Sequence, residues 1–328
     1  MISNLGLYFT DVHAHNYRQF DNSGSRLENC LDVIEYNYKF AHKNGIKVIM
    51  FGGDLYDQQK SLPTVVVNAV IARFKLLSSK YPEIAFVAIS GNHDYATKNL
   101  LDKPAETGLT HLATVIPNFF LIDNDHLEIE ELGVVIHGIP YYEYSEHYHE
   151  MLKRRAEHTK EFEEGTKHIL LIHQTPSNLS DPFLPVDTNI NDPAYECFDF
   201  IWCGHIHKRH VLSDKFIVGG TPLHRDLGDA GEDKGIWVQD LTDPTSANFM
   251  SLRGRYPEFK KVQEGHPEQD DESNYVVVEP SMERIDEGTV NAQRFGTNLT
   301  NRELLENYFD EVGDGDKETL EIGISLIS

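Results

Sequence analysis

The chain has 328 residues, of which 40% are hydrophobic and 25% charged, and its formal net charge is −24. This length suits one large α/β domain with a small appendage, and the composition is that of a globular protein. The negative charge argues against a general basic surface for nucleic acid, although acids that bind metal ions would reverse the local field.

Neither a membrane-spanning segment nor a secretory signal peptide is expected. The apolar runs are too short to cross a bilayer, and the N-terminus lacks the basic and hydrophobic regions of a signal peptide. The three cysteines are irregularly spaced and predict neither a disulfide framework nor a zinc ribbon. We therefore expect a cytoplasmic protein that makes no membrane contact.

The first part of the chain alternates between buried strands and amphipathic helices. Apolar runs predict strands over residues 5–9, 46–51 and 84–89. Helical spacing of apolar residues predicts helices over residues 26–44 and 63–80. This alternation predicts right-handed crossovers and a mainly parallel central sheet.

The later part of the chain continues the α/β pattern and ends in a different composition. Further strands are predicted over residues 134–139, 169–172 and 198–203, a helix over 144–164, and a late antiparallel set over 211–212, 216–218 and 235–241. These elements place a first domain at residues 1–255.

The remaining residues predict a linker and a small second domain. Residues 256–273 are polar and interrupted by Pro267, which is typical of a linker. A strand at residues 275–279 and a helix at 301–312, capped by Thr300 or Asn301, predict a small acidic α+β domain over 274–328.

Five short polar motifs each follow an apolar run. Open α/β sheets place their ligands at the carboxyl ends of strands, so these motifs are expected to meet. They supply carboxylate, amide and imidazole groups but no thiolate. The motifs are Asp11-Val12-His13, Gly53-Asp54, Gly91-Asn92-His93-Asp94, His173 and Gly204-His205-Ile206-His207.

The motifs contain enough ligands for two divalent cations, which together can hold a hydroxide that attacks a phosphate ester. Asp54 is predicted to bridge the two ions. This ligand set favours manganese, iron or zinc over calcium. The first ion would take Asp11, His13 and His207, and the second Asn92, His173 and His205.

His93 is the predicted catalytic imidazole, which protonates the departing sugar oxygen or stabilises its charge. Asp94 is predicted to hold the second ring nitrogen of His93. Two other histidines, His15 and His137, are either structural or lie on the substrate side. Asp57 is either a partner of the ligands or a cap for the following segment.

The ordered motifs resemble the calcineurin-like metallophosphoesterase superfamily. Residues 52–57 followed by 60–63, and residues 218–222 followed by 229–235, are similar to its double-strand-break-repair nuclease branch, which includes bacterial SbcD and its phage relatives. The resemblance covers residues 1–255. It implies a four-layer α/β/β/α sandwich with a catalytic His93 and with metal ligands at Asp11, His13, Asp54, Asn92, His173, His205 and His207.

The same resemblance implies a function. It implies manganese-dependent cleavage of DNA in repair and recombination, as a 3′-to-5′ double-strand exonuclease and a single-strand endonuclease. It also implies an SMC-like ATPase partner of the SbcC type and a nuclease homodimer, in the host cytoplasm if the source is a phage. Some nucleases of the branch have a histidine where this chain has Asp57.

Other functions remain open from the sequence. A small-molecule phosphodiesterase or a phosphoprotein phosphatase would use the same metals. Superfamily protein phosphatases usually show Asp-Arg-Gly after the second motif, where this chain has Asp57-Gln58-Gln59, so that branch is disfavoured. A non-catalytic scaffold is disfavoured because all seven ligand positions are retained.

Overall fold

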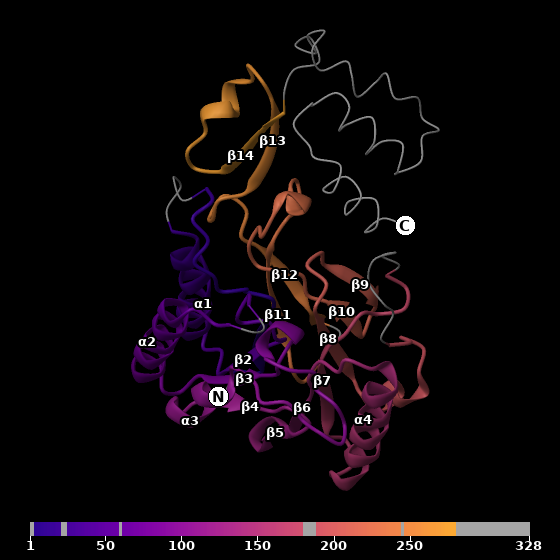
Figure 1. Ribbon diagram of the computed structural model, residues 1–328. Coiled ribbons are helices and arrows are strands. Elements are labelled where there is room, and N and C mark those ends of the chain that lie inside the picture. The colour runs from indigo at the N-terminus through magenta and orange to yellow at the C-terminus, as the bar shows by residue number, and fades with distance from the viewer. Residues whose placement is uncertain (1–2, 21–24, 59–60, 180–187, 244–245, 280–328) are drawn as a thin grey trace, which may run out of the picture. The chain divides into compact units, whose positions relative to one another are not determined.

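The computed structural model describes residues 3–20, 25–58, 61–179, 188–243 and 246–279 (Figure 1). Its contacts divide the chain into two compact units, one of Met1–Lys261 with Asp270–Val277 and one of Val262–Gln269 with Val278–Ser328. The elements that carry the site belong to the first unit. The helix predicted at residues 301–312 lies outside the described residues.

Two six-stranded sheets form the centre of the first unit. In the first sheet β1 to β4 run parallel, whereas β11 is antiparallel to both β1 and β12. Its strands, in spatial order, are β12 (Asn248–Ser251), β11 (Gly235–Asp240), β1 (Leu5–Phe9), β2 (Val48–Phe51), β3 (Ala85–Ala88) and β4 (Phe119–Leu121).

The second sheet is also mixed. Its inner strands β6, β7, β8 and β10 run parallel. At one edge β5 pairs antiparallel to β6, and at the other edge β9 pairs antiparallel to β10. The spatial order is β5 (His126–Ile129), β6 (Val134–Ile139), β7 (Lys167–His173), β8 (Phe200–Gly204), β10 (Phe216–Val218) and β9 (His210–Ser213).

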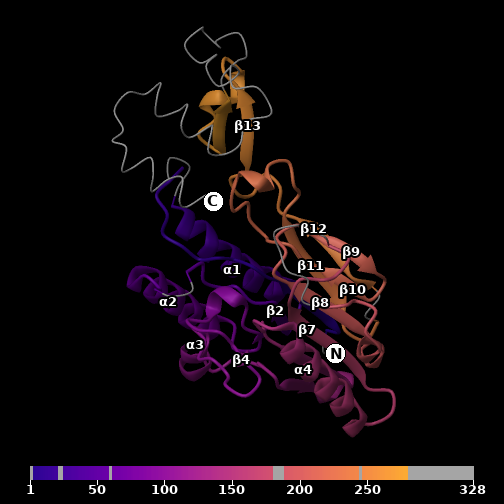
Figure 2. The same cartoon turned by 45° about the vertical axis from the view of Figure 1, so that its right-hand side comes forward.

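Helices cover the outer faces of both sheets. The helices α1 (Arg26–Lys43), α2 (Thr64–Lys80) and α3 (Thr110–Val115) share one hydrophobic core with the first sheet. The helix α4 (Ser145–His158) shares another core with the second sheet, on the opposite side of the molecule (Figures 1 and 2).

A third core lies between the two sheets. The ring of Tyr8 from β1 stacks on Trp202 from β8, with ring centroids 4.3 Å apart and planes 11° apart. The indole N–H of Trp202 donates to the Gln239 side chain of β11 at 2.9 Å, so its polar atom is satisfied inside this core. Helix, sheet, sheet and helix therefore make the expected four-layer sandwich, and the predicted fold class is confirmed.

Two predictions about the late strands are wrong. β9 and β10 pair antiparallel as predicted, but β11 does not join them, because it lies in the other sheet beside β1. The segment predicted as a linker contains a strand, β13 (Phe259–Gln263), paired with β14 (Tyr275–Glu279). Phe259 and Val262 of β13 are buried, but two apolar residues among charged ones gave too weak a strand pattern.

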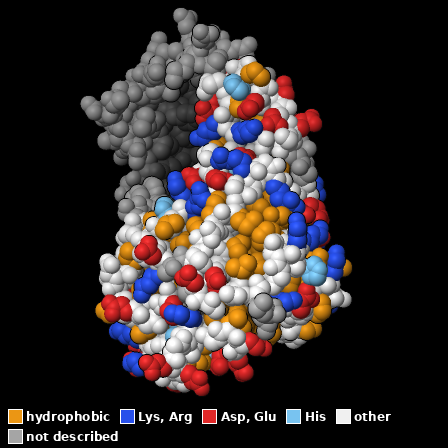
Figure 3. Space-filling view, turned by 180° about the vertical axis from the view of Figure 1, so that it is seen from behind, with side chains coloured by type: hydrophobic (Ala, Val, Ile, Leu, Met, Phe, Trp, Pro, Cys, Tyr) orange, Lys and Arg blue, Asp and Glu red, His pale blue; other side chains and the backbone are white. Residues whose placement is uncertain are grey.

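The surface is charged on the face seen from behind, where acidic and basic side chains are interspersed around a hydrophobic patch (Figure 3). On this face the negative charge therefore does not gather into one acidic surface.

Across the described ranges we find no helix with the length and hydropathy needed to cross a bilayer.

Candidate metal centre

The predicted ligands lie at the carboxyl ends of strands from both sheets. The loops that follow β1, β2 and β3 contribute four of them, and the end of β7 with the loop after β8 contributes three. Parallel strands end at the same edge of a sheet, which brings residues far apart in sequence together. The side chains brought together are Asp11, His13, Asp54, Asn92, His173, His205 and His207.

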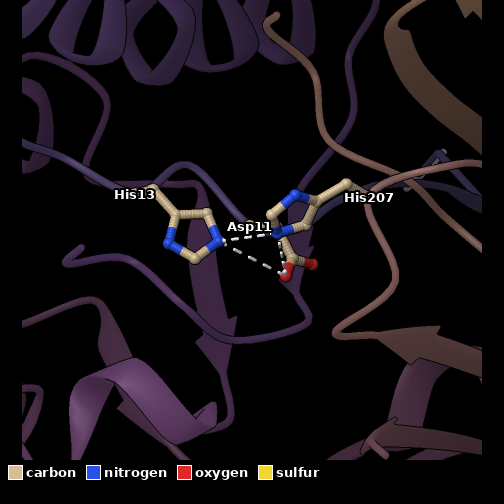
Figure 4. Close-up of side chains that lie close together, drawn as sticks. All are labelled: Asp11, His13 and His207. Atoms are coloured by element: carbon tan, nitrogen blue, oxygen red, sulfur yellow. Dashed lines mark hydrogen bonds and ion pairs between the residues drawn. The ribbon is translucent and has the colours of Figure 1, made fainter. Parts of the chain in front are cut away.

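The first group consists of Asp11, His13 and His207 (Figure 4). Their facing atoms are close, with His13 Nε2 at 3.1 Å from His207 Nε2 and 3.7 Å from Asp11 Oδ1. Asp11 Oδ1 is buried and has no hydrogen-bond partner among the described residues. A buried, unpartnered carboxylate oxygen facing two imidazoles is the arrangement that a cation would satisfy.

The second group consists of Asp54, Asn92, His173 and His205. His173 Nε2 lies 3.3 Å from Asp54 Oδ2 and 3.1 Å from Asn92 Oδ1. His205 Nδ1 lies 2.9 Å from Asn92 Oδ1. These spacings suit nitrogen and oxygen ligands that share one ion at bond lengths of about 2.0–2.2 Å.

Asp54 faces both groups with one carboxylate oxygen. Its Oδ2 lies 3.6 Å from His13 Nε2 in the first group and 3.3 Å from His173 Nε2 in the second. Its Oδ1 accepts a hydrogen bond from the His93 backbone N–H at 2.7 Å, which fixes the carboxylate plane. The residues present therefore fit a pair of divalent cations with Asp54 between them.

Four of these candidate ligands have an unusual backbone. The φ angles of Asp11, His13, Asp54 and His205 are 56°, 48°, 56° and 80°. Such left-handed conformations are uncommon for residues other than glycine and cost on the order of 1–3 kcal/mol each. Strain of this kind concentrates at functional sites, where the surrounding structure enforces it.

Two glycines allow the loops after β2 and β3 to approach closely. Gly53 has φ +101°, and a Cβ there would lie 2.6 Å from the backbone N of Gly91 and 2.7 Å from His173 Nδ1. A Cβ on Gly91 would lie 2.6 Å from the backbone N of Asp54. Side chains at these positions would push apart the loops that carry Asp54 and Asn92.

His93 and Asp94 do not make the contact that was predicted. The Asp94 carboxylate accepts hydrogen bonds from four backbone N–H groups, those of Asp54 at 2.8 Å, Leu55 at 3.0 Å, Tyr56 at 3.2 Å and Gly91 at 2.9 Å. The ring of His93 instead contacts the backbone carbonyl of Asp57 through Nδ1. The Asp94 side chain therefore joins the loop after β2 to the loop after β3 and does not orient the imidazole of His93.

Asp57, left open by the sequence, lies at the edge of the centre. Its carboxylate accepts hydrogen bonds from the Tyr17 hydroxyl at 2.5 Å and from Arg225 Nη2 at 2.9 Å. It also lies 3.5 Å from His13 Nδ1. No pattern in the sequence pointed to Tyr17. For Arg225 the one sign is its place between two segments that resemble the nuclease branch, residues 218–222 and 229–235.

The segment after β10 contacts the loop that carries His207 of the first group. The Lys234 ammonium pairs with Asp229 at 2.5 Å and donates to the His207 carbonyl at 2.9 Å. Asp229 Oδ2 accepts from the Arg225 backbone N–H at 2.7 Å. Residues that the resemblance singled out by pattern alone thus hold the loop that carries His207.

The remaining candidates have separate environments. His15 Nδ1 lies 2.6 Å from the His13 carbonyl oxygen, so His15 adjoins the centre. His137 is buried in the second sheet with Nε2 at 3.0 Å from His168 Nδ1, and it belongs to neither of the two groups.

Burial and neighbouring charges shift the pKa values of the candidate ligands in different directions. Burial lowers the pKa of His205 and of His207 to about 4, which leaves their nitrogens neutral and able to bind a cation. Burial alone would lower the pKa of His173, but the neighbouring Asp54 raises it to about 9. Burial opposes ionisation of Asp54, yet His173 beside it holds the pKa of that carboxyl well below its usual range.

A family model confirms the assignment that the motifs suggested. The model of the calcineurin-like phosphoesterases matches residues 7–209, which include every residue of the two groups. The chain belongs to the calcineurin-like phosphoesterase family. It is therefore a hydrolase of the metallophosphoesterase type, whose members bind divalent metal ions.

Two individual proteins are similar to this phosphoesterase. One is the DNA double-strand break repair protein Mre11 of Methanocaldococcus jannaschii, 24% identical over 204 residues. The match covers 62% of this chain and 51% of that protein, so the chain spans about half the length of this relative. The crystal structure of TT1561 of Thermus thermophilus matches 76% of this chain and 99% of its own, with 14% identity and a TM-score of 0.46.

Proposed function

We propose that this phosphoesterase is a metal-dependent DNA nuclease subunit that acts in repair and recombination. The observation that carries the proposal is the convergence of two ligand groups on Asp54, with His93 beside them. The similarity to a protein named for DNA double-strand break repair supports DNA as the substrate. We assign it 3′-to-5′ exonuclease activity on duplex DNA and endonuclease activity on single strands.

The residues have separate roles in the proposed hydrolysis. Asp11, His13 and His207 would hold one cation, Asn92, His173 and His205 would hold the other, and Asp54 lies between the two groups. Two such cations, which we propose to be manganese, would supply a nucleophile at neutral pH and would offset charge on the phosphate oxygens.

His93 has its ring fixed for proton transfer. The ring lies 4.8 Å from that of His13, centroid to centroid, at an angle of 87°. Its Nδ1 is occupied by the Asp57 carbonyl, so Nε2 is the nitrogen that can protonate the departing sugar oxygen. Asp94 contributes by fixing the loop that carries His93 and Asn92.

We further propose a cytoplasmic homodimer that works with an SMC-like ATPase subunit. Support for this assembly comes from the resemblance to the repair-nuclease branch and from the relative that is named as a repair protein. A pull-down with any SMC-like ATPase encoded beside this gene tests it, and retention of the phosphoesterase on that ATPase is the expected result.

The activity is tested with end-labelled duplex DNA and end-labelled single-stranded DNA in manganese. Release of mononucleotides from the 3′ ends of duplexes, and internal cleavage of single strands, are expected from the wild type but not from Asp54→Ala. Absence of cleavage both with and without the ATPase would overturn the proposal. In that case the ratio of activity on bis(p-nitrophenyl) phosphate to activity on the monoester identifies a phosphodiesterase or a phosphatase.

A further inference from the structure

Arg225 is held in place at three points beside the metal centre. Its backbone N–H donates to Asp229 Oδ2 at 2.7 Å, and its carbonyl accepts from Arg26 Nη2 at 2.6 Å. Its side chain donates from Nη2 to Asp57 Oδ1 at 2.9 Å. The first two contacts fix the backbone of Arg225, and the third orients its guanidinium before any ligand binds.

The other end of the guanidinium points at a candidate ligand. Arg225 Nη1 lies 3.3 Å from His207 Nε2, the same nitrogen that faces His13 in the first group. A guanidinium beside a site for divalent cations is repelled by them unless an anion lies between. The Asp57 carboxylate offsets part of this charge at Nη2, and an anionic substrate between the guanidinium and the cations would offset more.

The side chain is also accessible to a ligand. It is 29% exposed, whereas the Asp57 side chain that holds it is only 4% exposed. Arg225 lines an open pocket together with Tyr17, Arg26 and Phe259. A substrate can therefore reach the guanidinium from solvent, but it cannot reach the carboxylate that positions it.

We propose that Arg225 binds the scissile phosphate directly, donating hydrogen bonds to one of its non-bridging oxygens, and that Asp57 is its positioning residue. The planar fork of donors in a guanidinium matches the oxygens of a phosphate, and such charge-assisted bonds are short and strong. This inference rests on the proposed phosphodiester hydrolysis and names a further residue for it. Asp57 then orders two groups, since its carbonyl contacts His93 while its carboxylate holds Arg225.

Two readouts test the proposal on Arg225→Gln and Arg225→Lys. The first is the dissociation constant of inorganic phosphate for the manganese-loaded protein by calorimetry, and the second is kcat/KM for bis(p-nitrophenyl) phosphate. A lost charged hydrogen bond of about 1.5–3 kcal/mol predicts phosphate binding about 10- to 100-fold weaker in the Gln variant. The Lys variant keeps the charge but not the fork, so it should fall between the Gln variant and the wild type.

Asp57 is tested through its coupling to Arg225. Asp57→Asn should weaken phosphate binding, and the double variant with Arg225→Gln should bind phosphate no worse than Arg225→Gln alone. Full additivity of the two losses would overturn the positioning role. Methylguanidinium should partly restore activity to Arg225→Ala, which a role limited to fixing the loop would not permit.

The controls separate the possible failures. Arg154→Gln, which removes an exposed arginine of α4 paired with Glu150, should leave both readouts unchanged. Each variant must retain two equivalents of manganese by calorimetry. Wild-type affinity for phosphate in a metal-loaded Arg225→Gln protein would overturn the proposal. If the wild type cleaves neither DNA nor bis(p-nitrophenyl) phosphate, the proposed function fails, while phosphate binding still decides the role of Arg225.

Discussion

The ring nitrogen Nδ1 of His93 lies 2.5 Å from the backbone carbonyl oxygen of Asp57. A carbonyl oxygen can only accept, so the proton of this hydrogen bond belongs to Nδ1. The neutral imidazole therefore presents Nε2 as its unprotonated nitrogen, and protonation of that nitrogen makes His93 an acid. A backbone carbonyl thus fixes the orientation for which a carboxylate was predicted.

Replacing His93 separates catalysis from metal binding. His93→Asn keeps the backbone N–H that donates to Asp54, so both manganese equivalents should remain. The loss of an acid–base group predicts a fall in kcat of about 10²- to 10⁴-fold on bis(p-nitrophenyl) phosphate. His42→Asn, at a more exposed histidine paired with Glu83, should match the wild type. Near-normal turnover of His93→Asn would show that His93 has another role.

Removing Asp54 should abolish binding of both metal ions. Its Oδ2 faces both His13 of the first group and His173 of the second. Calorimetric titration of Asp54→Ala with manganese should therefore detect neither of the two equivalents seen in the wild type. Asp102→Ala, at an exposed acid, is the matched control. Retention of two equivalents by Asp54→Ala would contradict the bridging assignment.

Asp94 should matter for stability more than for proton transfer. Asp94→Ala leaves the buried N–H groups of Gly91, Asp54, Leu55 and Tyr56 without their acceptor. Each unsatisfied donor costs about 1–3 kcal/mol, so the free energy of unfolding should fall by at least about 3 kcal/mol. Urea titration in chelator measures this without a contribution from metal binding. A loss below about 1 kcal/mol, with kcat lowered instead, would restore the role first predicted from the sequence.

The sequence was sufficient to predict which residues meet, because their positions follow from backbone rules. Asp11, Asp54 and His173 each end or follow an apolar run, and strand ends of a parallel sheet share one edge. What these side chains contact was harder to predict. Asp94 follows His93 directly, but adjacent side chains in a tight turn point in different directions, and here Asp94 points toward the backbone of another loop.

Arg225 shows why the rest of the site was missed. It lies 168 residues from Asp57, and its importance arises from contacts with Asp57, Asp229 and Arg26 that no local pattern predicts. Arginines with acidic partners are common on protein surfaces, so composition does not distinguish this one. Its distance from His207 is available only from the folded chain.

A second cluster of histidines lies away from the metal centre, between the second sheet and α4. His137 Nε2 contacts His168 at 3.0 Å, and the rings of His126 and His158 lie 6.1 Å and 6.0 Å from the His137 ring. Burial, followed by the nearby His168 and Arg155, lowers the pKa of His137 to about 2. The side chain therefore stays neutral in the folded protein over the whole range in which an unfolded histidine takes up a proton.

This buried neutral histidine should make the protein less stable in acid. The unfolded chain binds a proton at His137 below its ordinary pKa of 6.5 and the folded chain does not, so stability falls as the pH drops below 6.5. One such group contributes about 1.4 kcal/mol per pH unit. His137→Gln can keep a hydrogen bond to His168 but cannot titrate. Between pH 6.5 and 4.5, in chelator, the wild type should lose about 2–3 kcal/mol more unfolding free energy than the variant. If the unfolding free energies of the wild type and of His137→Gln, measured by urea titration, fell in parallel with pH, His137 would be protonated in the folded state.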